Sequence, residues 1–306
     1  MWTALANYEG ATPITSGSES KTSALVAYQH GLKTMKIVAC VTHHFSRDRF
    51  TYLRTTIEGL KQSGIDTTVI CTNATQEEQA EVNELLSGSA DVRLLSFTSL
   101  GHPYQLTMYH RLVFRHLLQT DPSITHFLYT EDDHLFNAEN IKYWVTCREE
   151  LETFDNALIP GWFRVERSSS DGKWYSVDYH QSRLVSESRL EKVKNGYYVD
   201  SVCPYAGAYM LDRLLMSEFS ASEHFLHIPQ PPREGRYYAV REHAAFGMAW
   251  TNLRHGSFSR YRLRLSRHLD GIDPSALIEH LPGNYTAGGP FDLRPVREFN
   301  FIESCS

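Results

Sequence analysis

The chain has 306 residues, of which 42% are hydrophobic and 22% charged, a composition typical of a soluble globular protein with one large α/β domain or two small ones. The formal net charge of −6 gives no support to broad nucleic-acid binding, and no apolar run approaches the roughly 20 residues that a membrane-spanning helix needs. The five cysteines show no CxxC spacing and no secretory signal is apparent, so we expect a cytoplasmic protein, with peripheral membrane contact left open.

The first 34 residues differ in composition from the rest of the chain. They are rich in Ser, Thr, Gly and Ala and show no sustained hydrophobic periodicity. Met35 is followed at once by a β-rich apolar run. We therefore expect residues 1–34 to form a poorly structured extension, and the folded domain to begin at Met35.

From Met35 onward, strand-like and helix-like segments alternate. In the first helical segment Phe50, Leu53, Ile57 and Leu60 are spaced three, four and three apart, which is an amphipathic face. Strands are predicted at 36–41, 67–72, 92–97 and 127–129, and helices at 47–63, 76–86, 104–118 and 138–148. This alternation predicts a parallel sheet with right-handed crossovers. No GxGxxG or GxxxxGK[ST] motif follows the first strand, which weakens both a dinucleotide-binding dehydrogenase and a P-loop NTPase.

Three consecutive carboxylates, Glu131, Asp132 and Asp133, end the fourth predicted strand. Adjacent carboxylates repel one another unless a cation or strong hydrogen-bond donors lie between them. Ligands in open α/β sheets bind beyond the carboxyl ends of the strands, where Mg²⁺ or Mn²⁺ could join carboxylates to substrate phosphates. The alternative is a solvated acidic turn before the next helix.

The second half is less regular. We expect a strand at 157–165, a turn at 168–172 with a returning strand at 174–179, mixed strand and loop at 202–211, a proline-rich loop at 229–233 and a helix at 241–252. A basic run places Arg260, Arg262 and Arg264 on one side of a possible strand. That side could bind an anionic acceptor or a lipid-linked diphosphate, but we expect it to be a solvated face.

Four separated features then stand in a recognisable order. They are Glu131-Asp132-Asp133, which matches the E-D-D form of a DxD motif; the Tyr205–Tyr209 stretch around Gly207; Val240-Arg241-Glu242-His243, which is similar to an xED motif; and His280. Between Met35 and Tyr285 this order resembles the GT-A-fold glycosyltransferases. The third feature lacks an Asp, so Glu242 is taken as its carboxylate.

The resemblance implies an α/β fold with one GT-A-like domain. Residues 35–137 would form a Rossmann-like nucleotide-sugar-binding half with a mostly parallel sheet. Residues 138–286 would form the acceptor-binding and catalytic half, and 287–306 a tail. The implied reaction transfers a sugar from a nucleotide-diphosphate donor, for which we expect a UDP-sugar, to a hydroxyl of a glycan, lipid-linked or other acceptor. It would proceed with inversion and with Mn²⁺ or Mg²⁺.

The resemblance also implies roles for individual residues. Asp133 would bind the metal, with His280 completing the metal or diphosphate site. Glu131 and Asp132 would hold the ribose or base, or support the metal through water. Gly207 would allow close approach of the donor sugar, and Glu242 would be the catalytic base.

Position in the chain adds further candidates for contact with the nucleotide. Thr42 and His43 end the first strand and Asn73 the second, while Arg111 lies on the helix before the carboxylate strand. His134 is expected to point away from Asp133, because successive side chains alternate if the strand continues.

Three alternatives remain open at this stage. A retaining glycosyltransferase would differ only in the role of Glu242. A sugar-phosphate nucleotidyltransferase would share the acidic metal site but release pyrophosphate. A nucleotide-sugar- or glycan-binding module would bind metal and donor without turnover.

Overall fold

The computed structural model describes residues 35–89, 91–155, 157–177, 190–193, 196–200, 207–222, 225, 260–266 and 271–287. Several predicted features lie outside these residues: the extension 1–34, the loop 229–233, the helix 241–252 with Glu242, and the tail from residue 288. Within the described part of the chain, no helix has both the length and the apolar character needed to cross a membrane.

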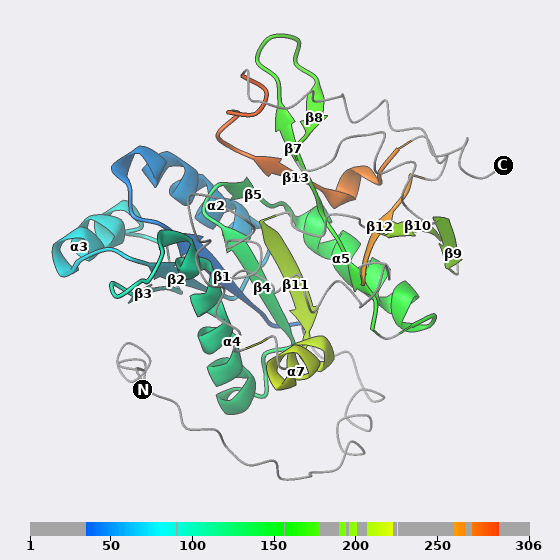
Figure 1. The fold of residues 1–306 in the computed structure, drawn as a ribbon, viewed down its shortest axis with the longest axis horizontal. Helices are drawn as coiled ribbons and strands as arrows, with labels where there is room; N and C mark the ends of the chain where they lie inside the picture. Colours follow the sequence, from blue (N-terminus) through cyan, green and yellow to red (C-terminus); the bar gives the residue numbers. More distant parts are fainter. Residues whose placement is uncertain are drawn as a thin grey trace.

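A five-stranded sheet forms the centre of the first half, in the order β11-β4-β1-β2-β3 (Figure 1). Four strands are parallel, as the alternating sequence pattern predicts: β1 (Ile37–His43), β2 (Thr67–Thr72), β3 (Val92–Ser96) and β4 (His126–Glu131). All seven residues of β1 are buried, as expected for a central strand covered on both faces. Strand β11 (Ala208–Asp212) closes the edge antiparallel to β4.

The helices follow the predicted order with small shifts at their ends. Helix α2 (Phe50–Gln62) begins after a 3₁₀ turn, η2 (Arg47–Arg49), and buries Leu53, Ile57 and Leu60. The others are α3 (Gln76–Leu85), η3 (Pro103–Met108), α4 (Tyr109–Thr120), α5 (Ala138–Glu152) and α7 (Arg213–Ala221). Helices α4 and α7 pack against each other, and α2 packs against α3 (Figure 1).

Two four-stranded sheets are built mostly from the second half. One has the order β5-β13-β7-β8, and the other β6-β12-β10-β9. Their strands are β5 (His134–Leu135), β6 (Ile159–Pro160), β7 (Phe163–Arg167), β8 (Trp174–Ser176), β9 (Leu190–Val193), β10 (Gly196–Asp200), β12 (Tyr261–Arg264) and β13 (Leu277–His280), the last preceded by η4 (Pro274–Ala276).

The single strand predicted at 157–165 is wrong. The chain leaves β6 after Pro160, passes through Gly161 and Trp162, and enters β7 in the other sheet. Proline has no N–H to continue a ladder, so the first piece is short. The predicted return strand is confirmed as β8, which pairs antiparallel with β7 after a turn at 168–172 and ends at Ser176.

The basic run of β12 is not a solvated face, so that prediction is also wrong. Arg260 and Arg262 are buried, and each contacts a glutamate: Arg260 binds both carboxylate oxygens of Glu218 at 2.9 Å, and Arg262 binds Glu191 at 2.8 Å. Arg264 lies 3.6 Å from Glu150. These ion pairs tie β12 to neighbouring elements.

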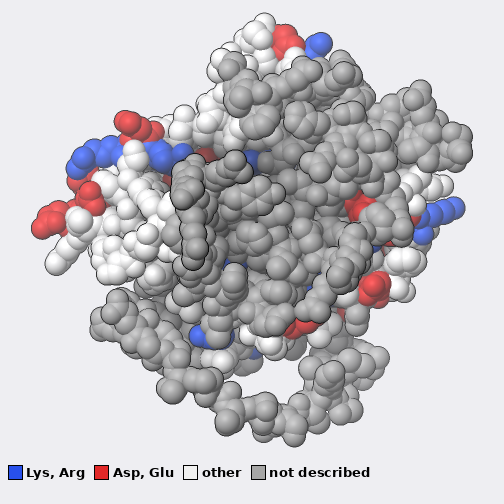
Figure 2. Space-filling view, in the orientation of Figure 1, with Lys and Arg blue, Asp and Glu red and all other residues white. Residues whose placement is uncertain are grey.

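On the face shown in Figure 2, described residues of both charges lie side by side over α2 and α3.

Candidate metal centre

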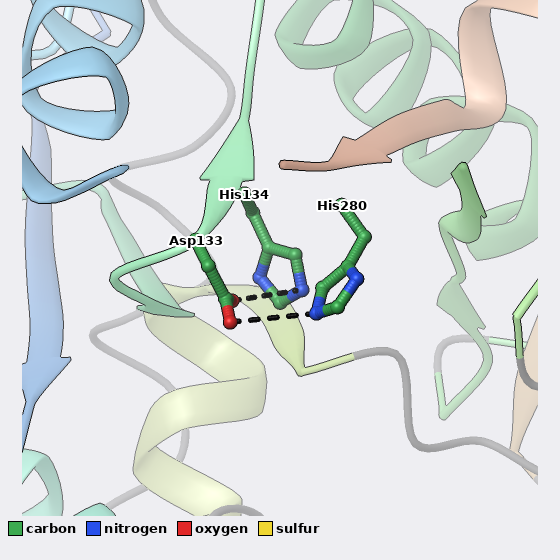
Figure 3. A group of neighbouring side chains, drawn as sticks. All are labelled: Asp133, His134 and His280. Atoms are coloured by element: carbon green, nitrogen blue, oxygen red, sulfur yellow. Dashed lines mark ion pairs between the residues drawn. The ribbon is translucent and has the colours of Figure 1, made fainter. Parts of the chain in front are cut away.

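The three-carboxylate motif forms the connection between two sheets. Strand β4 ends at Glu131, Asp132 and Asp133 form a turn, and β5 begins at His134. The prediction that His134 points away from Asp133 assumed a continuing strand. It is wrong, because the turn interrupts the alternation and brings both side chains to the same side (Figure 3).

Strand pairing brings a second histidine beside the first. In the antiparallel β5–β13 ladder His280 lies directly opposite His134, and their ring centroids are 5.7 Å apart. Nε2 of His134 is 3.6 Å from Oδ1 of Asp133, and Nε2 of His280 is 3.4 Å from its Oδ2 (Figure 3). All three residues are buried, and one ligand atom from each lies within 4.8 Å of the others. The backbone N–H of Leu281 donates to the Asp133 carbonyl at 2.8 Å, which fixes this arrangement.

Glu166 at the end of β7 orients His280. Nδ1 of His280 donates to Oε1 of Glu166 at 2.6 Å, so Nε2 is the nitrogen directed at Asp133. The other oxygen of Glu166 accepts the backbone N–H groups of Tyr285 at 3.0 Å and Thr286 at 2.9 Å. A carboxylate behind a ligating imidazole is the usual second partner of a metal-binding histidine.

Asp132 faces a different set of partners. Nδ1 of the fully buried His43 donates to its Oδ2 at 2.5 Å, and Nε of Arg49 donates to both of its oxygens at 3.1 and 3.2 Å. Nη2 of Arg49 also contacts Asp132 and donates to Oδ2 of Asp133 at 2.8 Å. His43 and Asp132 therefore contact each other, and Asp132 supports Asp133 through Arg49.

Neighbouring groups shift the pKa values of Asp133 and His280 in opposite directions. Burial alone would raise the pKa of Asp133, but the hydrogen bond with His280 and the charges of His134, His280 and Arg49 hold that pKa well below its usual range. Burial alone would lower the pKa of His280, yet hydrogen bonds with Asp133 and Glu166 raise it above its ordinary value. The Asp133 carboxylate is therefore held in its ionised form, which is the form that binds a cation.

The donor set fits a transition-metal ion better than Mg²⁺. Two imidazole nitrogens and one carboxylate oxygen suit Mn²⁺, Fe²⁺, Co²⁺ or Zn²⁺, whereas Mg²⁺ prefers an all-oxygen shell. Oδ1 of Asp133 is buried and accepts no hydrogen bond from the described residues, which leaves it available as a ligand atom.

Gly207 lies directly against this group. Its φ is +66°, and a Cβ built there would fall 2.2 Å from Cε1 of His134 and 3.3 Å from Oε2 of Glu131. The sequence predicted that a glycine is required here for close approach of a donor sugar. Within the chain, the His134 ring is the close neighbour of this position, and the approach of a donor sugar stays a prediction.

Four predicted residues remain to be placed: Thr42, Asn73, Arg111 and Glu242. Thr42 is buried at the end of β1, in register with Glu131 on the neighbouring strand. Asn73 lies one strand further on, where its side-chain oxygen accepts the Phe45 N–H at 2.7 Å. Arg111 lies in the core: it is 1% exposed, donates to the carbonyl of Phe225 at 3.2 Å and packs on the ring of Phe219. Glu242 is not among the described residues.

The buried position of Arg111 argues against contact with the nucleotide-sugar donor. Burial lowers its pKa to about 10, and its contacts include Phe219 of α7 and the Phe225 carbonyl after that helix. The sequence pattern placed it on the correct helix, but it did not show that the side chain turns into the α4–α7 interface.

Sequence reasoning missed Arg49 and Glu166 and set His134 aside. The signal for His134 was present, since a turn after consecutive carboxylates would have cancelled the strand alternation. Arg49 stands six residues after the end of β1, within reach of the carboxyl edge. No local pattern marks Glu166, because its role depends on the pairing of β7 with β13.

Comparisons with known proteins identify no family. No protein-family model matches the chain, and no curated protein matches it. Among solved structures, the crystal structure of S. aureus TarS is similar with a TM-score of 0.36 at 11% identity, over 60% of this chain and 30% of that one. The structure of S. aureus TarS 1-349 gives a TM-score of 0.39 at 11% identity, over 71% of this chain and 55% of that one. The chain thus covers less than two thirds of either structure, and similarity at this level assigns no activity.

Proposed function

We propose that this protein is a metal-dependent glycosyltransferase that moves a sugar from a nucleotide-diphosphate donor, a UDP-sugar, to an acceptor hydroxyl with inversion. The observation that carries the proposal is the buried group of Asp133, His134 and His280 beyond the carboxyl end of β4. Open α/β sheets bind their ligands at this edge.

The metal would be held by Asp133, His134 and His280, with Glu166 orienting His280 from behind. When bound, a divalent ion supplies positive charge that offsets the charge of the leaving nucleotide diphosphate. Because two of the three ligands are imidazoles, we propose Mn²⁺ rather than Mg²⁺ as the working ion.

The chain's own residues supply the remaining functions. Thr42 and Glu131 at the neighbouring ends of β1 and β4 are proposed to contact the donor, and Asn73 to hold the loop after β1 in place. His43 fixes Asp132 and is proposed to act through it rather than by touching the donor. Glu242 is the proposed base that takes the proton of the acceptor hydroxyl, as its resemblance to an xED carboxylate implies.

A donor screen tests the proposal without knowledge of the acceptor. The protein is incubated with nucleotide sugars and Mn²⁺, and slow release of nucleoside diphosphate is followed. We expect release with at least one donor, less with Mg²⁺, and none from Asp133→Asn. Glu81→Gln is the control, because Glu81 forms a surface ion pair with Arg47 of η2.

Each rival reaction gives a different product. Pyrophosphate released from a nucleoside triphosphate and a sugar phosphate would identify a nucleotidyltransferase. Donor binding without turnover on any acceptor would favour a binding module. A retained anomeric configuration in the product would rule out the inverting role of Glu242.

A further inference from the structure

Arg49 stands between the first strand and the acidic motif. It ends the η2 turn that follows β1, and its guanidinium reaches across to the turn after β4. Asp132 and Asp133 have side chains that are only 3% and 7% exposed, whereas that of Arg49 is 33% exposed. The more exposed guanidinium of Arg49 therefore lies between these two buried carboxylates and the solvent.

The two edges of this guanidinium are used differently. Nε and Nη2 donate to Asp132, and Nη2 also donates to Asp133. Nη1 donates to no residue in the described part of the chain. A guanidinium keeps its proton in proteins, so Arg49 brings a positive charge to both aspartates.

Arg47, two residues earlier on the same turn, shows a different arrangement. Its side chain is 67% exposed, and it uses Nε and Nη2 to bind the two oxygens of Glu81 at 2.7 and 2.6 Å. That pair lies on the surface, where ion pairs contribute little to stability. Arg47 thus provides a matched arginine that does not touch the acidic motif.

An anionic ligand approaching this edge meets several buried carboxylates. Glu131, Asp132, Asp133 and Glu166 all lie around the candidate metal centre, and all but Glu166 belong to one continuous segment. These carboxylates repel a diphosphate unless cations already in contact with them offset their negative charge. An arginine can satisfy both needs, because its planar fork offers two separate donor edges.

We propose that Arg49 binds a phosphate oxygen of the donor's diphosphate through Nη1 while Nε and Nη2 hold Asp132 and Asp133. This inference rests on the proposed function and adds to it the residue that recognises the diphosphate. Arg49 is a substrate-binding residue in this account, and it links the donor to the carboxylate that holds the metal.

The test measures two affinities by calorimetry, that of Mn²⁺ alone and that of inorganic pyrophosphate in saturating Mn²⁺. Arg49→Lys keeps a positive charge near the aspartates but lacks the second donor edge. We expect its Mn²⁺ affinity to stay close to that of the wild type. Its pyrophosphate affinity should fall about 10-fold or more, as is typical for loss of a charge-assisted hydrogen bond. Arg47→Lys should change neither affinity.

Two results would overturn the inference. A folded Arg49→Lys protein that binds pyrophosphate as the wild type does would exclude the contact. Equal losses of Mn²⁺ and pyrophosphate affinity would show that Arg49 acts only by positioning Asp133. Should Arg49→Lys fail to fold, a crystal structure of the wild type with Mn²⁺ and pyrophosphate decides the point, since Nη1 must then contact a phosphate oxygen.

The same titration separates this inference from the proposed function. A wild-type protein that binds Mn²⁺ but neither pyrophosphate nor UDP contradicts both. A wild-type protein that binds UDP and releases it from a donor, together with an unaffected Arg49→Lys variant, leaves the proposed function intact and removes only the role of Arg49.

Discussion

Replacing Glu166 by Gln should weaken metal binding even though the residue touches no metal. One oxygen of Glu166 accepts from Nδ1 of His280 at 2.6 Å, and the other accepts two backbone N–H groups, from Tyr285 and Thr286. Glutamine offers only one acceptor oxygen. If that oxygen keeps the backbone groups, the amide NH₂ faces Nδ1, and His280 must carry its proton on Nε2, where it blocks a metal.

The expected loss follows from this exchange. Removing an outer-shell partner of a ligating histidine typically costs about 10 to 100-fold in metal affinity, or about 1.4 to 2.8 kcal/mol. If the glutamine amide instead leaves one of these buried groups unpaired, the free energy of unfolding falls by ~1–3 kcal/mol. Calorimetric titration with Mn²⁺ measures the first quantity and urea denaturation the second.

Glu279→Gln is the matched control for Glu166→Gln. Glu279 precedes His280 on β13, and its side chain points to the opposite face of that strand. We expect its Mn²⁺ affinity to be that of the wild type. A folded Glu166→Gln protein with unchanged Mn²⁺ affinity would refute the reasoning, because His280 would then need no partner at Nδ1.

Three further predictions concern other residues. Gly207→Ala places a Cβ against the His134 ring and should lower Mn²⁺ affinity by at least about 10-fold by displacing that ligand. Gly64→Ala is the control, because Gly64 also has a positive φ but a Cβ there would meet nothing within 4 Å. Equal losses of Mn²⁺ affinity in both variants would show that backbone strain alone is responsible. Burial lowers the pKa of His126 to about 4, below the value of about 6.5 expected when unfolded. The contribution of neutral His126 to the free energy of unfolding is therefore present above pH 6.5 and is lost as the pH falls toward 4. About 2 kcal/mol of that contribution is lost between pH 7 and pH 5. Denaturant unfolding at pH 7 and pH 5 should show that the free energy of unfolding changes by that amount less in His126→Gln than in the wild type. An equal change in both proteins would contradict this prediction. Glu242→Gln should keep donor affinity while turnover falls at least about 10²-fold, and normal turnover would remove the base assignment.

Sequence patterns predicted the first half of the fold well, because its information is local. The spacing of Leu53, Ile57 and Leu60 marks one helix face, and the apolar runs of β1 and β4 mark central buried strands. The second half was harder, since its sheets pair strands far apart in the chain. Pro160 marks where the first strand stops, but nothing near it shows that β6 and β7 join different sheets.

The candidate site divides in the same way. Asp133 and Gly207 could be picked out from the motif around each of them, and both lie at the group that the structure assembles. The position of His134 opposite His280 depends on the β5–β13 register, and the contacts of Arg49 depend on how η2 meets the turn after β4. Those are long-range relations, which no local spacing encodes.

An anomalous difference map from a crystal soaked in Mn²⁺ tests the central claim most directly. The account predicts one strong peak within bonding distance of a carboxylate oxygen of Asp133 and Nε2 of both His134 and His280, and a much weaker site in Asp133→Asn crystals. A map without a peak there, or with Mn²⁺ held by Glu131 and Asp132 instead, would contradict it.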